Sequence, residues 1–429
     1  MHKAFVAKIE AVEPIPGADR IHLAVVMGER VVVTKDWEVG MVGIFFPPDI
    51  QLSEEYCRYN NLYRKAMNND DISKTGFFEE NRRVRCQPFR KVNSGGFFAQ
   101  TDSLLYTGYN LQKLKLGEQF DTLNDKEICR KYVSPESLKA ASASGTPKKI
   151  RDKEMPFFAK HLDTEQFRYY ADKIPVGALL SFHAKAHGTS FRVGNTLVIK
   201  KLGKVKTWIN KFYSLFPNKE YQHVVGTRNV ILGSPEKEGF HGKETYRFDI
   251  GKLLEPQLSQ GMEVYGEIVG FVNGKSIMPP HATSGLENKD FTKKYGEHIT
   301  YTYKCNQTQY DWFVYRVTMT NEEGEVVEFS AKQVERWAEM KGFKATFEVH
   351  PQMIYDGDVE KLKALVEQLT ERPECLTEDY RDPSHISEGV IIRVDTGKAK
   401  PEFYKSKSYA FRVLEGIVSE NTVDLEAVG

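Results

Sequence analysis

Hydrophobic residues in the first 47 positions come in short runs that turn residues separate. These runs are rich in Val, Ile, Phe and Ala and cover residues 5–12, 21–27, 30–33 and 40–47. Runs of strand length with little helical periodicity predict a small antiparallel β-barrel. Residues 92–107 are predicted to form its later strands, and the polar, aromatic stretch 51–91 an elaborated loop. The first domain is therefore predicted over residues 1–133.

The pattern changes after residue 133. Residues 134–154 are rich in Ser, Ala, Pro, Gly and charge and have no apolar face to bury, which predicts a linker. A second domain is predicted from residue 155 to residue 429. It mixes strand-like runs with helical patterns, so its predicted class is α+β. The strands are expected at 178–183, 262–269, 311–317 and 389–394, and the helices at 331–340 and 359–369.

Composition supports a globular protein of more than one domain. The chain has 429 residues, of which 40% are hydrophobic and 12% aromatic, and roughly 100–200 residues make one domain. No apolar run reaches the roughly 18 residues that a membrane-spanning helix needs. The five cysteines are dispersed without a CxxC pair, which excludes a cysteine-based zinc module and favours a reducing compartment. We therefore expect an intracellular protein.

The net charge of +1 hides an uneven distribution of charged residues. Residues 191–219 contain seven Lys or Arg and no acid, and residues 81–91 contain five basic residues and no acid. Residues 321–388 carry 17 acids and 8 bases. Basic segments with interleaved aromatics suit phosphate contacts and base stacking, although a solvated surface has the same composition. The basic residues expected to contact such a polynucleotide are Arg82, Arg83, Arg85, Lys204 and Lys206.

The candidate chemistry begins at Lys185, in the string FHAKAHGTSF of residues 182–191. An apolar strand there enters a glycine-containing turn and a second strand follows. Taken alone, this string fits a surface lysine at a hairpin end equally well. Five further strings follow in order, namely TRN at 227–229, VYGEIVG at 264–270, DWFVYRV at 311–317, SEGVII at 387–392 and FYKSK at 403–407.

Together the six strings resemble the motif series of the covalent nucleotidyltransferases, the superfamily of polynucleotide ligases and mRNA capping enzymes. K-x-H-G at Lys185–Gly188 is similar to RNA ligases, and PIPGADRI at 14–21 is similar to the N-terminal OB domain of Deinococcus-type nick-sealing RNA ligases. The resemblance implies an N-terminal OB-fold barrel. An α+β nucleotidyltransferase domain of the ATP-grasp-like ligase type, with antiparallel sheets and helices, would follow it.

The resemblance also implies roles for individual residues. Lys185 would take AMP from ATP, and Lys405 and Lys407 would bind its phosphates. Glu388 would hold Mg²⁺ or Mn²⁺, and Glu267 would contact the ribose or a metal-bound water. The remaining nucleotide-binding residues would be Ala186, His187, Gly188, Arg228 and, stacked on the base, Tyr315.

Physical chemistry explains why such residues are needed. A lysine attacks phosphorus only as the neutral amine, and with an ordinary pKa of about 10.4 it is almost wholly charged at neutral pH. Nearby cations lower a lysine pKa and also stabilise phosphate charge. Carboxylates are oxygen ligands suited to Mg²⁺ or Mn²⁺. One departure bears on the nucleotide. In many RNA ligases the residue directly before the nucleophile is a glutamate that helps to recognise adenine. This chain has Ala184 at that position, so the identity of the nucleobase stays open.

The implied partner is RNA with 3′-OH and 5′-phosphate ends, as a nicked duplex, bound by a monomer inside a cell, or inside an infected cell if the protein is viral. A DNA ligase and an RNA-capping guanylyltransferase are the enzyme alternatives. Only 22 of the 429 residues follow Lys407, too few for the further OB domain usual in both. A non-catalytic RNA-binding protein is the other alternative. Finally, residues 270–276 resemble a P-loop but are one residue short between the glycines, which predicts a hairpin turn instead.

Overall fold

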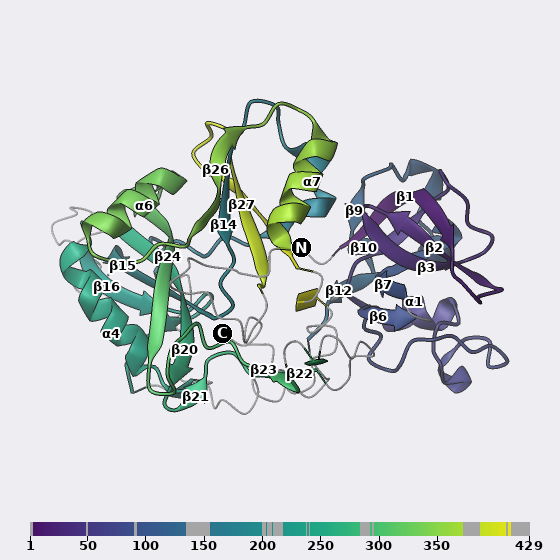
Figure 1. The fold of residues 1–429 in the computed structure, drawn as a ribbon, viewed down its shortest axis with the longest axis horizontal. Helices are drawn as coiled ribbons and strands as arrows, with labels where there is room; N and C mark the ends of the chain where they lie inside the picture. The colour runs from purple at the N-terminus through teal and green to yellow at the C-terminus, as the bar shows by residue number, and fades with distance from the viewer. Residues whose placement is uncertain are drawn as a thin grey trace. The chain divides into compact units, whose positions relative to one another are not determined.

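The computed structural model describes residues 3–48, 50–89, 92–133, 155–199, 203, 208, 218–236, 238–239, 241–283, 292–293, 296–371, 387–408 and 411–412. These divide into two compact units, unit 1 with residues 3–133 and unit 2 with residues 155–412 (Figure 1). The predicted linker at 134–154, together with Lys204 and Lys206, lies outside the described residues.

Unit 1 is an antiparallel barrel built around its first strand. The main sheet has the order β3-β2-β1-β4-β8, and β9 also pairs with β1. A register shift between Ile9 and Ala11 divides β1, so that its first half pairs with β4 and its second half with β2. Such a bulge bends a strand and allows it to serve two sides of a barrel. The strands are β1 (Ala4–Pro14), β2 (Ile21–Val26), β3 (Glu29–Thr34), β4 (Val42–Phe46), β8 (Phe97–Ala99) and β9 (Gln119–Phe120).

The remainder of unit 1 corrects one prediction. The strand prediction for 92–107 is right as far as Ala99, but Thr101–Thr107 forms a 3-10 helix that ends at Gly108. Leu104 and Thr107 are both buried, and their spacing of three residues matches the 3-10 repeat. The predicted loop region 51–91 contains short elements of its own. These and the other small elements of unit 1 are β5 (Ile50–Leu52), α1 (Glu54–Tyr59), β6 (Cys86–Phe89), β7 (Val92–Gly95), β10 (Thr122–Leu123), β11 (Lys126–Glu127) and β12 (Cys129–Lys131).

Unit 2 contains two large sheets, of which the larger has seven strands, and two small two-stranded sheets. The small sheets pair β18 (Glu238–Gly239) with β19 (Gly242–Lys243) and β22 (His281–Ala282) with β23 (His298–Ile299). The order of the seven-stranded sheet is β17-β16-β15-β20-β24-β25, with β21 paired to β20. Helix α4 (Thr245–Leu254) contacts β15 and β16, and α6 (Ala331–Met340) contacts β24 (Figure 1). Ser330 and Gln333 form a capping box that starts α6. The strands are β15 (Thr189–Ile199), β16 (Lys219–Gly226), β17 (Ile231–Leu232), β20 (Met262–Val272), β21 (Lys275–Ser276), β24 (Tyr310–Thr320) and β25 (Val326–Glu328).

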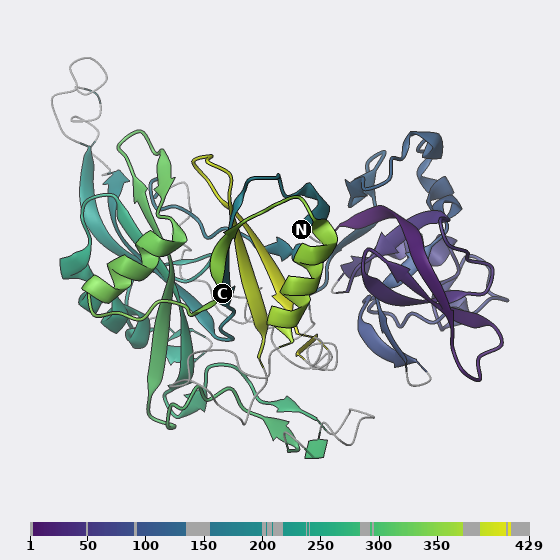
Figure 2. The same ribbon diagram turned by 45° about the horizontal axis from the view of Figure 1, so that its top comes forward.

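The second sheet of unit 2 has five strands in the order β13-β28-β27-β14-β26. All pairs are antiparallel except β13 with β28. Helix α7 (Val359–Thr370) covers β27 and β28, as Figure 2 shows. The predicted fold class is confirmed, and the predicted helix 331–340 coincides with α6. The strands are β13 (Glu165–Gln166), β14 (Leu179–Ala184), β26 (Glu348–Ile354), β27 (Gly389–Asp395) and β28 (Glu402–Lys407).

Two smaller predictions concern the segment after β20 and the membrane. Strands β20 and β21 are joined by the two-residue turn Asn273–Gly274, with φ of 53° and 74°. Positive φ at both positions is the type I′ hairpin turn, so the predicted hairpin at the P-loop-like string is confirmed. None of the helices in the described part of the chain has the length and apolar character needed to cross a bilayer.

Candidate active site

Lys185 lies where the chain passes from one sheet of unit 2 to the other. Strand β14 ends at Ala184 and β15 begins at Thr189. The Lys185 N–H donates to the carbonyl of Gly389 at 2.9 Å, which extends the pairing of β14 with β27. A Cβ on Gly188 would lie 2.1 Å from the carbonyl oxygen of Ile268 in β20. The turn therefore presses against β20 through a position that only glycine can occupy.

The register of β14, β27 and β28 aligns the predicted residues in two rows across one face of the sheet. The first row is Lys185, Gly389 and Lys407, and the second row is His183, Ile391 and Lys405. Residues two apart on a strand share a face, so both rows face the same way. Gly389 has φ of 140°, and a Cβ there would lie 2.0 Å from the Ser406 carbonyl. The centre of the first row is therefore a position that only glycine can occupy.

Glu388 is the buried anion beneath the first row. Its carboxylate is 2% exposed and lies 2.8 Å from the Lys185 ammonium and 3.9 Å from the Lys407 ammonium. Burial raises the pKa of Glu388, but Lys185, His187 and Lys407 outweigh burial and hold the pKa at about 2. The carboxylate is thus charged at neutral pH. The structure brings Lys185, Glu388 and Lys407 together as the sequence predicts.

His187 is held among aromatic rings rather than on the pocket wall. Its ring packs edge-on against Tyr301 and Phe411, with centroids 4.5 and 4.8 Å away. The backbone N–H of His187 donates to the Tyr303 hydroxyl at 2.7 Å, and the ring Nδ1 lies 3.7 Å from Glu388 Oε2. The position of His187 therefore fixes the turn and neighbours the buried carboxylate. Ala186, the preceding residue, does line the pocket.

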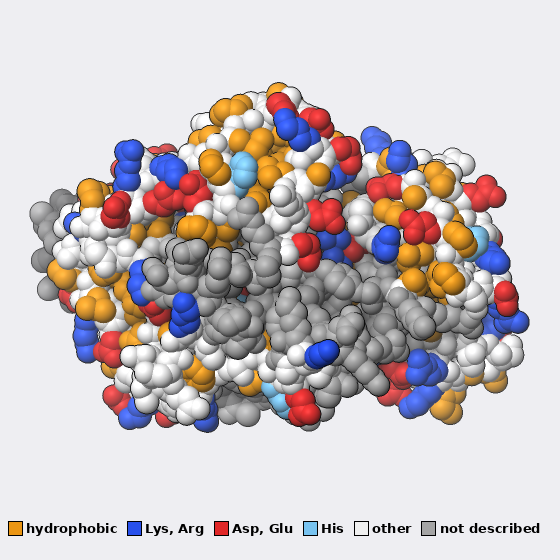
Figure 3. Space-filling view, viewed as in Figure 1, with side chains coloured by type: hydrophobic (Ala, Val, Ile, Leu, Met, Phe, Trp, Pro, Cys, Tyr) orange, Lys and Arg blue, Asp and Glu red, His pale blue; other side chains and the backbone are white. Residues whose placement is uncertain are grey.

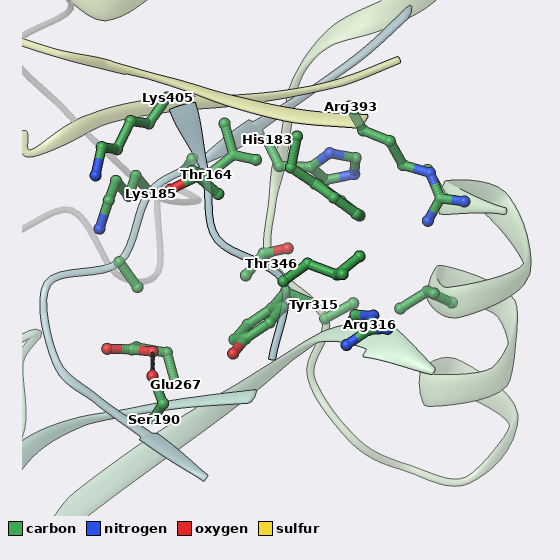
Figure 4. A pocket seen from close by; sticks show the side chains of 18 of the residues that line it. Thr164, His183, Lys185, Ser190, Glu267, Tyr315, Arg316, Thr346, Arg393 and Lys405 are labelled. Atoms are coloured by element: carbon green, nitrogen blue, oxygen red, sulfur yellow. Dashed lines mark hydrogen bonds between the residues drawn. The ribbon is translucent and has the colours of Figure 1, made fainter. Parts of the chain in front are cut away.

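A pocket opens between the two sheets above these rows (Figure 4). Lys185 and Lys405 lie at one end of it, and Arg316 and Arg393 at the other. Glu267 lies on the Lys185 side and accepts a hydrogen bond from the Ser190 hydroxyl at 3.0 Å. Ser190 and Glu267 are register partners in β15 and β20, so this hydrogen bond joins neighbouring strands. The pocket thus has cationic side chains at both ends, and a carboxylate lies beside those at the Lys185 end.

Tyr315 and Arg228 also line the pocket, and each has a partner from the segment before β13. The Tyr315 hydroxyl lies 2.6 Å from Nε2 of His161. Burial, Arg228 and Arg316 lower the pKa of His161 to about 3, so His161 is neutral at pH 7. Arg228 forms an ion pair with Asp163 at 2.7 Å. Because β24 bulges opposite Tyr265 and Gly266, Tyr315 leaves the regular ladder and its side chain reaches the pocket.

Residues that the sequence did not single out complete the walls. His161, His183, Ser190 and Glu335 all line the pocket. Strand periodicity could have found His183, because it stands two residues before Lys185, and Ser190, because it begins the strand after the turn. His161 and Glu335 come from segments far from Lys185 in the sequence, and nothing in their local pattern marks them.

The three arginines predicted to bind RNA lie in unit 1. Arg82 donates to the carbonyls of Leu52 at 3.0 Å and Glu80 at 3.2 Å, and the Arg83 guanidinium lies over the Tyr132 ring at 4.7 Å. Arg85 is exposed. On the face of unit 1 seen in Figure 3, basic and acidic side chains are interspersed and form no single-sign patch. Arg82 and Arg83 therefore support local structure, which leaves Arg85 as the most accessible of the three.

The predicted metal ligands do not form a cluster by themselves. Within the described ranges, no three His, Cys, Asp or Glu side chains gather closely enough to hold a metal ion. Glu388 nevertheless keeps one oxygen available, since Oε2 is buried and has no hydrogen-bond partner among the residues described. A buried oxygen of that kind suits a cation whose other ligands are substrate phosphates and waters.

Comparisons with known proteins bear on the family and the fold. A family model described as RNA ligase matches residues 181–408, more than half of the chain, and an OB-fold domain model matches residues 3–100. No curated protein sequence matches the chain significantly. Among solved structures, Naegleria gruberi RNA ligase with PPi has a TM-score of 0.58 at 17% identity, covering 96% of this chain and 98% of that chain. A lysine-to-methionine mutant of the same ligase, with AMP and Mn, has a TM-score of 0.58 at 16% identity with the same coverage. These structures share the fold, and the family model assigns the chain: it belongs to the RNA ligase family.

Proposed function

We propose that this chain is an ATP-dependent RNA ligase that joins 3′-OH and 5′-phosphate ends through a lysyl-AMP intermediate. The observation that carries the proposal is the first row, in which the Lys185 ammonium lies 2.8 Å from buried Glu388 with Lys407 beside it. The Naegleria gruberi ligase has been solved with ATP and Mn, with AMP and Mn and with PPi, which supports ATP as the nucleotide.

The first step requires Lys185 to change partners. Its nitrogen attacks the α-phosphorus of ATP, a P–N bond forms, and the bond to the pyrophosphate oxygen breaks. Only the neutral amine can attack, so the ion pair between Lys185 and Glu388 must be exchanged and a proton lost first. Lys405 and Lys407 supply fixed positive charge where negative charge gathers on the phosphates. AMP then passes to the 5′-phosphate of RNA, and the 3′-OH displaces it to form the phosphodiester.

The other pocket residues would bind the nucleoside. Glu267, held by Ser190, would accept a hydrogen bond from a ribose hydroxyl. Tyr315 would stack on the base, and Arg228 would contact the ribose or a phosphate. Ala186 lines the pocket beside the nucleotide, Gly188 lets the turn pack against β20, and His187 fixes that turn.

The residues present fit a divalent cation, Mg²⁺ or Mn²⁺. Glu388 Oε2 would be its direct ligand, since that oxygen is buried and has no hydrogen-bond partner in the described part of the chain. Glu267 would contact a water of its shell. When bound, the cation supplies positive charge to the phosphates.

The proposal extends to the RNA and to the domains. We infer a domain at 1–133, a linker at 134–154 and an adenylation domain at 155–429.

Arg85, Lys204 and Lys206 are the basic residues whose contacts with a nicked duplex are easiest to test, since Arg82 and Arg83 hold local structure. The protein would act as a monomer inside a cell. Charge reversal at Arg85 is expected to weaken RNA binding and to reduce its salt dependence.

The first experiment is incubation with α-labelled ATP and Mg²⁺ or Mn²⁺, followed by denaturing electrophoresis. We expect a labelled adduct that is stable to alkali and sensitive to acid, as a phosphoramidate is. Lys185→Ala should abolish it, while Lys252→Ala, at an exposed lysine of α4, should leave it unchanged. An adduct that persists in Lys185→Ala would refute the assignment, and an adduct with GTP alone would favour a capping enzyme.

The second experiment is end-joining on defined substrates. Nicked duplexes are prepared with RNA or DNA on the 3′-OH side, and single-stranded RNA serves for comparison. Sealing that requires an RNA 3′-OH strand at a nick supports the proposal. Equal sealing of all-DNA nicks would favour a DNA ligase instead.

A further inference from the structure

The pocket continues along β14 beyond Lys185, from the end with Lys185 and Lys405 toward the end with Arg316 and Arg393 (Figure 4). His183 stands two residues before Lys185 on the same face, so the second row lies about 7 Å from the first along the strand. Ile391 of the second row and Tyr315 of the other sheet both line the pocket here. A nucleotide with its phosphates at the first row would therefore extend its base past these two side chains.

Helix α6 closes this part of the pocket. Ala331, Val334 and Glu335 of α6 line it together with Thr346. The carboxylate of Glu335 lies 3.6 Å from His183 Nε2 through Oε1 and 2.9 Å from the Lys332 ammonium through Oε2. Both Glu335 and His183 are largely buried, at 28% and 13% exposure. The pocket thus has a carboxylate on the wall that faces His183.

Glu335 is ionised at neutral pH. Its contact with His183 and its ion pair with Lys332 lower its pKa, against the opposing effect of burial. An ionised carboxylate accepts hydrogen bonds and donates none. Adenine carries a 6-amino group that donates, whereas guanine carries a 6-oxo group that accepts. A carboxylate that meets position 6 of the base therefore accepts a hydrogen bond from adenine and is repelled by the 6-oxo group of guanine, which could bind there only by presenting its N1–H and 2-amino donors instead.

The other charged side chains of the pocket wall differ from Glu335 in their partners or in their position. Arg393 donates to both oxygens of Asp395 at 2.8 and 2.9 Å, and Arg316 pairs with Glu328. Glu267, the other acidic side chain among the described lining residues, lies on the Lys185 side with Ser190. Glu335 is thus the carboxylate placed next to the second row.

We propose that Glu335 determines the nucleobase specificity of this site by accepting a hydrogen bond from the 6-amino group of adenine, with Lys332 and His183 holding its carboxylate in place. The inference rests on the proposed nucleotide transfer to Lys185 and adds the group that reads the base. It gives α6 a role in substrate selection besides its packing against β24. It also supplies an acidic adenine contact in a chain that has Ala184 before the nucleophile.

The test compares three nucleotides in two variants. ATP, GTP and purine riboside triphosphate, which lacks the 6-amino group, are used to form the lysyl-nucleotide adduct with wild type, Glu335→Gln and the control Glu339→Gln. Glu339 lies on the same helix but is exposed. A hydrogen bond to a charged group corresponds to roughly ten- to hundredfold in affinity. Wild type should therefore prefer ATP over the purine analogue by at least about tenfold in KM.

Glu335→Gln replaces a charge-assisted hydrogen bond by a neutral one and should raise the KM for ATP by about tenfold, while the rate at saturation stays unchanged because the contact is the same in ground and transition states. Its preference for ATP over the purine analogue should fall by a similar factor, and its discrimination against GTP should weaken because the amide can also donate. Glu339→Gln should behave as wild type.

Three results would overturn the inference. An equal loss for all three nucleotides in Glu335→Gln would mean that Glu335 only maintains the fold of the pocket. A wild type that uses ATP and the purine analogue equally well, or that prefers GTP, would mean that no carboxylate reads the amino group. If Glu335→Gln does not fold, Glu335→Asp replaces it and should raise the KM for ATP but not that for the purine analogue. A wild type that forms no adduct with any nucleotide would instead refute the proposed function.

Discussion

Glu388 and Glu263 are both buried carboxylates of unit 2, at 2% and 0% exposure, but their pKa values shift in opposite directions. The pKa of Glu388 is held at about 2, whereas burial raises the pKa of Glu263 to about 7. Burial acts on both in the same sense, so the difference comes from their partners. Two ammonium groups lie within 4 Å of Glu388, at 2.8 and 3.9 Å.

The partners of Glu263 are mainly neutral. Its Oε2 lies 2.7 Å from the Tyr265 hydroxyl and accepts from the Ala159 N–H at 2.9 Å. The two nearby arginines use their donors elsewhere, since Arg316 pairs with Glu328 and Arg192 donates to backbone carbonyls. Glu263 is therefore easily protonated and acts as a structural hydrogen-bonding group, while Glu388 stays ionised and keeps Lys185 charged until a substrate changes its surroundings.

The largest expected effect separates the two carboxylates by activity. Glu388→Gln removes the anion beside Lys185 and the proposed cation ligand, so formation of the lysyl-AMP adduct should fall by roughly a hundredfold or more. Glu263→Gln imitates the protonated acid and should leave the adduct rate within about twofold, as measured by single-turnover labelling.

Equal losses of adduct formation in the two variants would contradict the different roles assigned to the two carboxylates, because they would place Glu263 in the reaction or Glu388 outside it. Thermal unfolding of both variants is the control, since a variant that is not folded at the assay temperature loses activity for a different reason.

The next effect is on stability and sharpens the view that the Glu263 region is structural. Arg316 and Glu328 form an ion pair with both side chains almost fully buried. Arg316→Met leaves the Glu328 carboxylate buried without its partner, which should lower the free energy of unfolding by about 3–5 kcal/mol. Lys363→Met breaks the exposed pair with Glu360 and should change it by less than about 0.5 kcal/mol. Urea unfolding midpoints measure both, and equal effects would contradict the expectation.

Local pattern was enough to predict the elements that carry the first row. The apolar runs around 178–183 and 389–394 and the glycine turn at 188 predicted the strands and the turn, because a buried strand and a tight turn each need particular residue types. The order of the motif strings predicted that Glu388 and Lys407 lie near Lys185, although about 200 residues separate them from it in the sequence. Fold class and these three residues were therefore predictable.

The walls of the pocket were not predictable in the same way. His161 reaches Tyr315 only because the segment before β13 crosses the other sheet, and Glu335 reaches His183 only because α6 packs on β24. Helical periodicity predicted α6, but it cannot tell which polar residue of a helix meets a pocket. Likewise, a basic composition did not reveal that Arg82 donates to backbone carbonyls.

A third prediction uses the pH dependence of stability near the pocket. Glu263 has a folded pKa of about 7, above its ordinary value of 4.5, so its contribution to stability is lost as pH rises between 4.5 and 7. His161 has a folded pKa of about 3, below its ordinary 6.5, so the unfolded state takes up the proton first and stability rises with pH between 3 and 6.5. Each of the two groups changes the free energy of unfolding by about 2 kcal/mol between pH 5 and pH 7, and the two changes have opposite sign.

The two contributions nearly cancel in the wild type and should be separable in variants. His161→Gln is expected to become less stable by about 2 kcal/mol as pH rises from 5 to 7, relative to the wild-type profile. Glu263→Gln is expected to become more stable by about the same amount over that range. Urea unfolding at several pH values gives the slopes, and only the slopes are compared because each substitution also changes the absolute stability. Parallel profiles in all three proteins would show that neither shift exists.

The smallest effect concerns the contact between Tyr315 and His161, which joins the pocket to the structural region. Tyr315→Phe keeps the ring that would stack on the base but removes the hydroxyl 2.6 Å from His161 Nε2. The loss of one buried hydrogen bond should lower the free energy of unfolding by about 1 kcal/mol, while the KM for ATP changes by less than about threefold. Tyr315→Ala should raise the KM much further, since it also removes the stacking surface. If Tyr315→Phe raised the KM as much as Tyr315→Ala does, the hydroxyl and not the ring would bind the nucleotide. His161, the partner of that hydroxyl, would then take part in nucleotide binding and would not be purely structural.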